Sequence, residues 1–266
     1  TQLELLQRIR MENKKTNIEV YIGSVYNEVR LENIFAKQHI DLVFHAAAYK
    51  HVPLMEDSPQ EAIRTNILGT YNVAKVCDKY SVEKMVLVSS DKAVRPTNVM
   101  GATKAFAEKI VKHFDSFSKT NYAAVRFGNV LGSHGSVVPI FKKQIEKGGP
   151  ITITHPEITR FFMTIPEAVS LILQSGVYAG GGEIFILDMG KPVKILELAE
   201  DLIRLSGFEP YTEIPIQITG LRPGEKLFEE LLMDEEGIKA TKHDKIFIAK
   251  PSEINYERIR MDLEHL

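Results

Sequence analysis

Cysteine is almost absent from the sequence, since Cys77 is the single one among 266 residues. No disulfide can therefore form within the chain, and this usage fits a reducing cytoplasm, where we expect the protein to work. Cys77 lies in an apolar helical pattern, so we interpret it as a small core residue rather than a reactive thiol.

Long hydrophobic runs are missing as well. No apolar stretch is long enough to span a bilayer, and the first residues do not form a signal peptide. We therefore expect no membrane contact from this segment. The sequence starts at Thr1 rather than Met, and a longer N-terminal region could hold the protein at the cytoplasmic face of the inner membrane.

The sequence also lacks an excess of charge of either sign, because 35 Asp and Glu residues balance 33 Lys and Arg residues. These charges are scattered, whereas nucleic acids and membranes require a concentrated basic face. We therefore expect no nucleic-acid partner. No His/Cys/Asp cluster has metal-ligand spacing, so we expect no metal, and no G-x-S-x-G or Cys/His arrangement indicates a covalent hydrolase.

Strand-like and helix-like segments alternate along most of the chain. Short β-branched or nearly continuous apolar runs predict strands at Ile18–Ile22, Asp41–Ala46, Met85–Ser89, Tyr122–Phe127 and Glu183–Leu187. Helical spacing predicts helices at Leu31–Gln38, Pro59–Tyr80, Ala102–Phe117, Pro166–Val177 and Ile195–Leu205. This alternation predicts an α/β fold with a doubly wound parallel sheet of the Rossmann type.

The glycine-rich element that opens such a sheet is missing. A dinucleotide-binding domain begins with a strand, a G-x-G-x-x-G turn and a helix whose N-terminus holds the pyrophosphate, and no such motif occurs here. The chain opens instead with Leu3–Met11, which reads as an amphipathic helix leading to the strand Ile18–Ile22. If that strand is the third of the sheet, the first two strands and the phosphate loop lie before Thr1.

The pattern of the chain changes near Gly148, where short strands and a region rich in Pro and Gly begin. We predict a dinucleotide-binding domain over residues 1–150, with residues 165–206 packing back onto it. A smaller, interleaved substrate-binding lobe is predicted over residues 151–164 and 207–266.

Five segments carry a family signature. They are HAAAYKHVPLME (45–56), SSDKAVRPTNVMGATK (89–104), RFGNVLGS (126–133), TRFFM (159–163) and LRPGEK (221–226). Together they resemble the CapD-type polysaccharide-biosynthesis proteins, which are UDP-N-acetylglucosamine 4,6-dehydratases of the extended short-chain dehydrogenase superfamily. The resemblance implies an enzyme of capsule, lipopolysaccharide or protein-glycan synthesis that uses NAD and a UDP-sugar. We also expect a homo-oligomer.

Asp91 and Lys92 stand side by side after a predicted strand, where open α/β sheets place their ligands. The resemblance implies that Asp91 is the general acid at C6 of the sugar and Lys92 the base at C5. A lysine acts as a base only without its proton, so we expect burial or a nearby cation such as Lys104 to lower the pKa of Lys92. Outside this motif, a solvated Ser-Asp turn would be the plain interpretation.

The resemblance further implies that Ser90 binds the 4-hydroxyl and that Lys104 binds the nicotinamide ribose. Four residues before that lysine most short-chain dehydrogenases carry a tyrosine, but this sequence has Met100, which cannot transfer a proton. The departure is shared by a branch of the resembled family. The base for the 4-hydroxyl stays open between water, Asp91 and Lys104.

The other site residues are also implied by the resemblance. The expected contacts with NAD are Ser24, Val25, His45, Ala46, Ala47, Ala48, Asn66 and Lys104, where Ser24 replaces a common aspartate. The expected contacts with the UDP-sugar are Lys50, Asn129, Arg160, Arg222 and Glu225, and a guanidinium suits phosphate oxygens better than an ammonium. Taken alone, His45 and Asn66 would be structural side chains, and each arginine a surface ion pair.

Two other functions remain open at this point. A nucleotide-sugar 4-epimerase on the same fold needs only the C4 hydride step, normally with a tyrosine at position 100, and does not need Asp91 and Lys92. A non-catalytic NAD-binding scaffold or sensor is the alternative from another class, because a fold alone does not fix function. Whether C5 is inverted is also left open.

Overall fold

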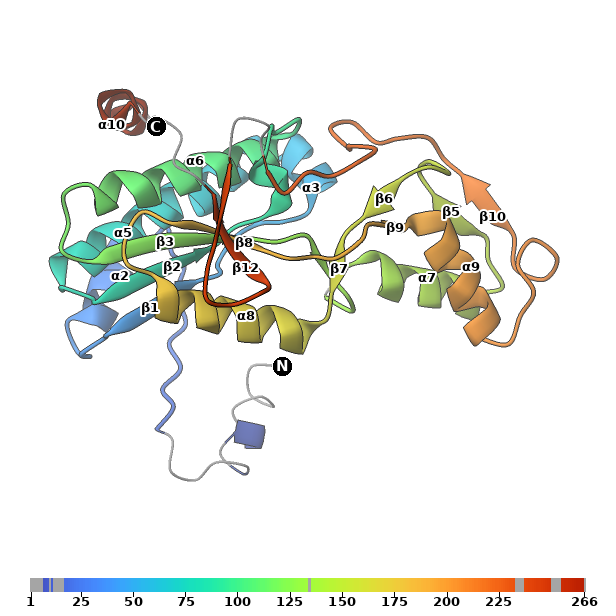
Figure 1. Ribbon diagram of the computed structural model, residues 1–266, viewed down its shortest axis with the longest axis horizontal. Coiled ribbons are helices and arrows are strands. Elements are labelled where there is room, and N and C mark those ends of the chain that lie inside the picture. Colours follow the sequence, from blue (N-terminus) through green and yellow to red (C-terminus); the bar gives the residue numbers. More distant parts are fainter. Residues whose placement is uncertain are drawn as a thin grey trace.

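A computed structural model of the chain describes residues 7–9, 11, 17–133, 135–232, 237–249 and 255–265. It forms a larger lobe around a central sheet and a smaller lobe beside it (Figure 1). The central sheet has six strands in the order β1-β2-β3-β8-β12-β11. The doubly wound α/β prediction is thus confirmed.

Four parallel strands form the core of this sheet: β1 (Leu42–His45), β2 (Lys84–Val88), β3 (Asn121–Arg126) and β8 (Ile184–Leu187). Their apolar runs are covered by helices on both faces, which is why they read as continuous hydrophobic stretches. Two later strands, β12 (Ile246–Ala249) and β11 (Ile238–Ala240), extend the sheet in antiparallel register.

Helices cover both faces of the sheet. One face carries α2 (Glu28–Phe35), α5 (Gly69–Lys79) and α6 (Val99–Asp115), with α10 (Tyr256–Glu264) lying outside α6, and the other face carries α8 (Ile165–Tyr178) (Figure 1). Asn98 caps α6, because its Oδ1 accepts a hydrogen bond from the Gly101 N–H at 2.7 Å. Three short helices, α3 (Val52–Asp57), α4 (Pro59–Ala62) and the π-helical η1 (Ile63–Leu68), lead into α5, so the helix predicted over Pro59–Tyr80 is present in pieces.

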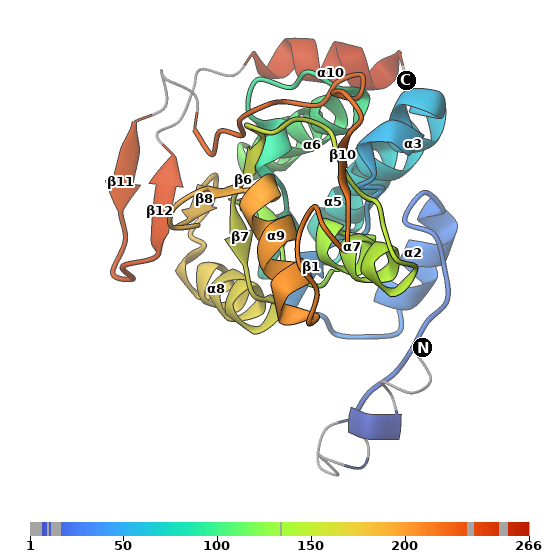
Figure 2. The same cartoon turned by 90° about the vertical axis from the view of Figure 1, so that its right-hand side faces the viewer.

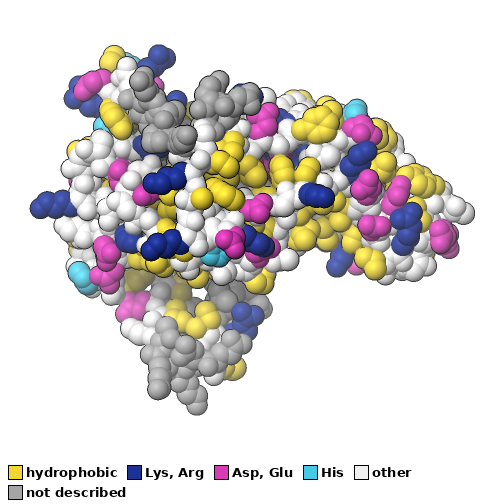
Figure 3. Space-filling view, viewed as in Figure 1, with side chains coloured by type: hydrophobic (Ala, Val, Ile, Leu, Met, Phe, Trp, Pro, Cys, Tyr) yellow, Lys and Arg dark blue, Asp and Glu magenta, His cyan; other side chains and the backbone are white. Residues whose placement is uncertain are grey.

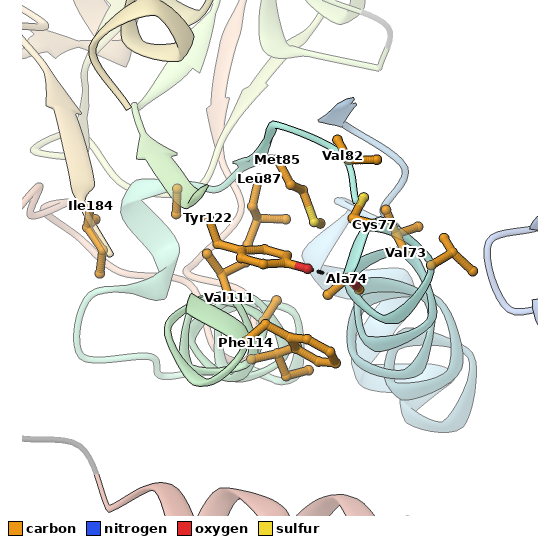
Figure 4. Packing of buried hydrophobic residues seen from close by; sticks show 14 of the residues in the cluster. Val73, Ala74, Cys77, Val82, Met85, Leu87, Val111, Phe114, Tyr122 and Ile184 are labelled. Atoms are coloured by element: carbon orange, nitrogen blue, oxygen red, sulfur yellow. Dashed lines mark hydrogen bonds between the residues drawn. The ribbon is translucent and has the colours of Figure 1, made fainter. Parts of the chain in front are cut away.

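The core between the sheet and α5/α6 contains the lone cysteine. Cys77 is fully buried, and burial raises the pKa of its thiol to about 12, which makes it unreactive. Nearby, the Tyr122 hydroxyl donates to the Ala74 carbonyl at 2.8 Å while its ring packs near Phe114 (Figure 4). The interpretation of Cys77 as a core residue is therefore confirmed.

The predicted strand Ile18–Ile22 is wrong. Residues 17–24 are irregular and Ile22 is 83% exposed, because within the described residues no strand lies beside them and β1 pairs only with β2. The predicted helix Leu3–Met11 falls mostly outside the described residues, of which 7–9 and 11 are helical.

The smaller lobe, which faces the viewer in Figure 2, has its own hydrophobic core. It contains α7 (Val137–Glu146), α9 (Ile195–Leu205) and the parallel pair β5 (Ile151–Ile153) and β10 (Ile216–Ile218). Two short pairs, β4 (Asn129–Val130) with β7 (Phe162–Met163) and β6 (Thr159–Arg160) with β9 (Val193–Lys194), connect the lobes.

This packing differs from the division expected from the sequence. Helices α7 and α9 were expected on the dinucleotide-binding domain, but their apolar faces bury Phe141 and Ile203 against β5 in the smaller lobe. Strands β11 and β12 were expected in the smaller lobe, but they pair with β8 of the central sheet. Helix α8 and strand β8 do return to the larger lobe, because their apolar side chains complete its core.

Among the described residues, no helix has the length and apolar character needed to cross a membrane. Hydrophobic side chains gather on the surface where the two lobes meet (Figure 3).

Candidate active site

A cavity of about 470 Å³ lies where the lobes meet, beyond the carboxyl ends of β1, β2 and β3. A second cavity of about 250 Å³ adjoins it. The two share the side chains expected to bind a UDP-sugar, which are Lys50, Asn129, Arg160, Arg222 and Glu225, together with Lys92. Residues spread over the whole sequence thus converge on one place.

The loop after β2 presents Ser90 and Asp91. Residues 91–93 form a short 3-10 helix (η2, Asp91–Ala93), and Ser90 caps it by accepting the Lys92 N–H at 3.3 Å. The Ser90 hydroxyl donates to Asp91 Oδ1 at 2.8 Å. Helix α6 approaches this loop closely at Gly101, where a Cβ would lie only 2.3 Å from the Lys92 carbonyl oxygen.

Lys92 lies between carboxylates. Its Nζ is 3.0 Å from Asp91 Oδ1 and 2.8 Å from Glu229 Oε1, and it donates to Asn129 Oδ1 at 3.4 Å. Burial alone would lower the pKa of Lys92, but the charges of Asp91 and Glu229 outweigh it and raise that pKa. The expectation of a lowered pKa for Lys92 is therefore wrong.

Glu229 is the member of this cluster that sequence reasoning missed. The segment before it is pinned to the loop after η2, since Thr97 and Asn98 both donate to the Gly224 carbonyl at 3.0 Å and Lys226 donates to the Val94 carbonyl at 2.9 Å. These contacts bring Glu229 over Lys92. The only sequence signal was a carboxylate three residues beyond the LRPGEK motif, inside an apolar stretch.

Arg160 organises carboxylates and backbone around the cluster. Its Nε is 3.2 Å from Glu229 Oε1 and its Nη2 is 3.4 Å from Glu225 Oε1. Its Nη1 donates to the Thr159 and Leu227 carbonyls at 2.7 and 3.3 Å. Most of its donors are thus engaged within the protein, whereas Arg222 is exposed and lines both cavities.

Lys104 and His45 carry unusual pKa values. Lys104 Nζ donates to the Val88 carbonyl at 2.6 Å, and burial lowers its pKa to about 8 although Glu108 partly offsets the effect. Burial, with help from the Lys104 charge, lowers the pKa of His45 to about 3, so its ring is neutral. Met100 is buried and lines the cavity near Lys104, where no proton transfer by its side chain is possible.

Four of the residues expected to bind NAD, Ser24, Val25, His45 and Asn66, line neither of these two cavities. Asn66 uses its amide to hold the loop after β1, accepting the Tyr49 N–H at 2.8 Å and donating to Tyr49 O and Thr103 Oγ1 at 3.0 and 2.9 Å. Ser24 and Val25 form a turn before α2 that packs on α5. His45 Nε2 lies 3.0 Å from Thr70 Oγ1.

The part of the cavity nearest β1 and α6 fits a cofactor ring. Ala46 and Ala48 line it with small side chains, so a flat group can approach the backbone, and Lys104 supplies a positive charge beside them. Ala47 is not among the lining residues. In the described part of the chain, no group of His, Cys, Asp and Glu could hold a metal ion.

The sequence is similar to proteins of polysaccharide biosynthesis. The family described as "Polysaccharide biosynthesis protein" matches residues 1–251. The chain is 54% identical over 243 residues to the capsular polysaccharide biosynthesis protein CapD of Staphylococcus aureus, covering 91% of this chain but 40% of CapD. It therefore spans less than half of that relative's length.

The chain is also similar to a UDP-sugar epimerase in sequence and to a solved structure in fold. The chain is 40% identical over 236 residues to the UDP-glucose 4-epimerase of Rickettsia canadensis, covering 88% of this chain and 67% of that protein. The crystal structure of Pen from Bacillus thuringiensis superposes with a TM-score of 0.84 at 37% identity, over all of this chain and 86% of Pen.

Proposed function

Because the chain belongs to the polysaccharide biosynthesis protein family, among the nucleotide-sugar-modifying enzymes of the extended short-chain dehydrogenase type, we propose that it is an NAD-dependent UDP-N-acetylglucosamine 4,6-dehydratase. Its product is a UDP-4-keto-6-deoxy sugar for capsule, lipopolysaccharide or protein-glycan synthesis. The observation that carries this proposal is the contact of Ser90, Asp91 and Lys92 with one another beside the two adjoining cavities.

Ala46, Ala48 and Met100 would border the bound cofactor, and Lys104 would hold its ribose. Bound NAD supplies the hydride chemistry, which is removal from C4 of the sugar and return to C6. Lys104 holds a positive charge at neutral pH despite its lowered pKa of about 8, and so binds hydroxyl oxygens as a donor.

Ser90 binds the 4-hydroxyl and passes its proton to Asp91. Its hydroxyl already donates to Asp91 Oδ1 at 2.8 Å, so a proton arriving at Ser90 Oγ leaves along this hydrogen bond. This path takes over the proton transfer that a tyrosine performs in most short-chain dehydrogenases, where this chain has Met100. Asp91, once protonated, gives that proton to the 6-hydroxyl, which leaves as water.

Lys92 takes the C5 proton in its neutral form. Its ammonium first gives a proton to a carboxylate, and the acceptors lie in contact with it, Asp91 at 3.0 Å and Glu229 at 2.8 Å. Ketone formation at C4 makes the C5 proton acidic, which assists the transfer. The raised pKa of Lys92 then keeps the captured proton available for return to C5.

The UDP part of the substrate lies toward the second cavity. Arg222 and Lys50 are exposed there and offer cationic donors to the diphosphate. Asn129 lies near the sugar phosphate and Glu225 near the uridine ribose. Arg160, whose donors mostly serve the protein itself, orients Glu225 and Glu229 for this contact.

A UDP-sugar 4-epimerase is the second candidate, and the 40% identity to the Rickettsia protein favours it. Epimerisation needs the C4 step alone, and gives no function to Asp91 and Lys92. Mass spectrometry of the sugar nucleotide separates the two functions, using the full-length protein with NAD and UDP-N-acetylglucosamine. Loss of one water supports the dehydratase, whereas a C4 epimer of unchanged mass supports the epimerase. No change in any UDP-sugar would leave a non-catalytic NAD-binding protein.

A further inference from the structure

Two buried carboxyl groups share one ammonium in this site. Lys92 Nζ contacts Asp91 Oδ1 at 3.0 Å and Glu229 Oε1 at 2.8 Å, and the two carboxylate side chains are only 0% and 4% exposed. Each carboxylate oxygen that contacts Lys92 Nζ also has a second donor. Asp91 Oδ1 accepts a hydrogen bond from the Ser90 hydroxyl, and Glu229 Oε1 lies 3.2 Å from Arg160 Nε.

The second oxygen of each carboxyl is different. Asp91 Oδ2 and Glu229 Oε2 are both buried and have no hydrogen-bond partner. A buried carboxylate oxygen without a donor is costly, and two of them beside each other repel. Because the two carboxyls interact directly, one proton between them would satisfy both oxygens at once.

The charges around Asp91 and Glu229 also favour one shared proton on this pair of carboxyl groups. Three carboxyls, Asp91, Glu225 and Glu229, are in ion-pair contact with two cations, Lys92 and Arg160. If all were ionised, the carboxyls in direct ion-pair contact would outnumber the contacting cations by one, and a single proton removes this difference. Lys50, Arg222 and Lys226 line the same cavity, but among the described residues they form no ion pair with these carboxyls. Burial raises the pKa of Glu229 to about 7, whereas the Lys92 charge and neighbouring donors outweigh burial and lower the pKa of Asp91.

We propose that Glu229 is a positioning residue that shares one proton with Asp91 and reloads it as the general acid. The 4-hydroxyl proton first reaches Asp91 through Ser90. As Asp91 gives a proton to the departing 6-hydroxyl, which leaves as water, Asp91 takes the Glu229 proton, Glu229 takes the Lys92 ammonium proton, and the Lys92 amine takes the C5 proton. After hydride has returned to C6, Lys92 gives a proton back to C5 and is reprotonated by Asp91, so that one proton is again shared with Glu229. This inference rests on the proposed dehydratase function.

Glu229→Gln tests the shared proton with little change in shape. The amide still accepts from Lys92 and Arg160 and donates permanently to Asp91 Oδ2, but it carries no acidic proton. We expect kcat for water loss to fall by about 10²-fold, with KM changed less than threefold. In the wild type kcat falls as pH rises through about 7, and this fall is absent in the variant.

Two further variants separate this role from a structural one. Glu230→Gln makes the same change one residue along the chain, where the carboxylate is 43% exposed beside Arg95, and should keep the wild-type rate and pH profile. Glu229→Asp keeps an acidic proton and should recover part of the rate together with the fall near neutral pH. An unchanged kcat and pH profile in Glu229→Gln would overturn the proposal.

Infrared spectroscopy can detect the protonated carboxyl group of this pair in the absence of substrate. A carboxylic-acid C=O band should be present in the wild type at pH 6, disappear as pH rises through about 7, and be missing from Glu229→Gln over the same pH range. If that band is found but no UDP-sugar is dehydrated, the proton pair stands and the proposed reaction fails. If water loss occurs but the wild type and Glu229→Gln have identical bands, the proposal for Glu229 fails alone.

Discussion

Lys92 Nζ lies 2.8 Å from Glu229 Oε1, although one residue follows strand β2 and the other lies on the segment that returns from the smaller lobe. Together with the contact of Lys92 Nζ with Asp91 Oδ1 at 3.0 Å, it holds the ammonium between two carboxyl groups. The candidate acid–base cluster therefore depends on a chain segment that follows the smaller lobe.

Lys92→Met should separate the two halves of the reaction. Without an amine near C5, water loss should slow by about 10²–10⁴-fold, whereas oxidation at C4 does not need Lys92. Mass spectrometry of a quenched single turnover should then find a 4-keto sugar that still carries its 6-hydroxyl. Lys84→Met, at the opposite end of β2, is the matched control and should behave as wild type. Normal water loss in Lys92→Met would contradict the assigned role.

Lys104→Met should stabilise the protein at neutral pH while impairing activity. Burial lowers the pKa of Lys104 from 10.5 to about 8, so keeping it charged in the folded state costs on the order of 3 kcal/mol. The lost hydrogen bond to Val88 offsets about 1 kcal/mol of the gain. We expect a net increase of roughly 2 kcal/mol in the free energy of unfolding at pH 7.

The pH dependence of this gain has a definite sign. Below pH 8 the folded and unfolded states both hold the Lys104 proton, and the full cost is present. Between about 8 and 10.5 only the unfolded state still binds it, so wild-type stability rises relative to the variant. Urea unfolding at pH 7 and pH 10 should show the difference shrinking. A gain that is independent of pH would contradict the lowered pKa.

The buried ion pair of Arg126 and Glu108 should contribute to the stability of the fold. Arg126 Nη2 is 2.7 Å from Glu108 Oε2, the side chains are 2% and 5% exposed, and Ser89 also donates to Glu108. Arg126→Met should lower the free energy of unfolding by about 3–5 kcal/mol, because Glu108 is left buried without a countercharge.

The double variant Arg126→Met/Glu108→Leu should recover part of this loss in chemical denaturation, since no uncompensated charge remains. Arg204→Met on α9 removes an exposed pair with Glu200 and serves as the control, with an effect of less than about 1 kcal/mol. Equal destabilisation by the single and double variants would show that charge burial is not the cause.

The sequence was sufficient for the parallel core of the sheet and for the contiguous part of the site. Buried strands read as apolar runs, and Ser90, Asp91 and Lys92 are neighbours in the chain, so local pattern places them. The strand at Ile18–Ile22 was wrong because a β-branched run forms a strand only where another strand pairs with it.

The remainder depended on contacts between distant segments. Whether α7 and α9 pack on the central sheet or on each other is decided by tertiary packing of their apolar faces, which helical spacing cannot show. Glu229 reaches Lys92 only because the Gly224–Lys226 segment is pinned to the loop near Thr97 and Asn98. The charge of Asp91, together with that of Glu229, outweighs burial and raises the pKa of Lys92, which reverses the expected shift.

Proton exchange at C5 is the most direct test of the proposed dehydratase. The full-length protein would be incubated with NAD and UDP-N-acetylglucosamine in deuterated water and followed by NMR. We predict loss of one water with deuterium incorporated at C5, and the ring couplings will show whether C5 is inverted. An unchanged sugar, or a C4 epimer with hydrogen retained at C5, from a folded and NAD-loaded sample would contradict the account.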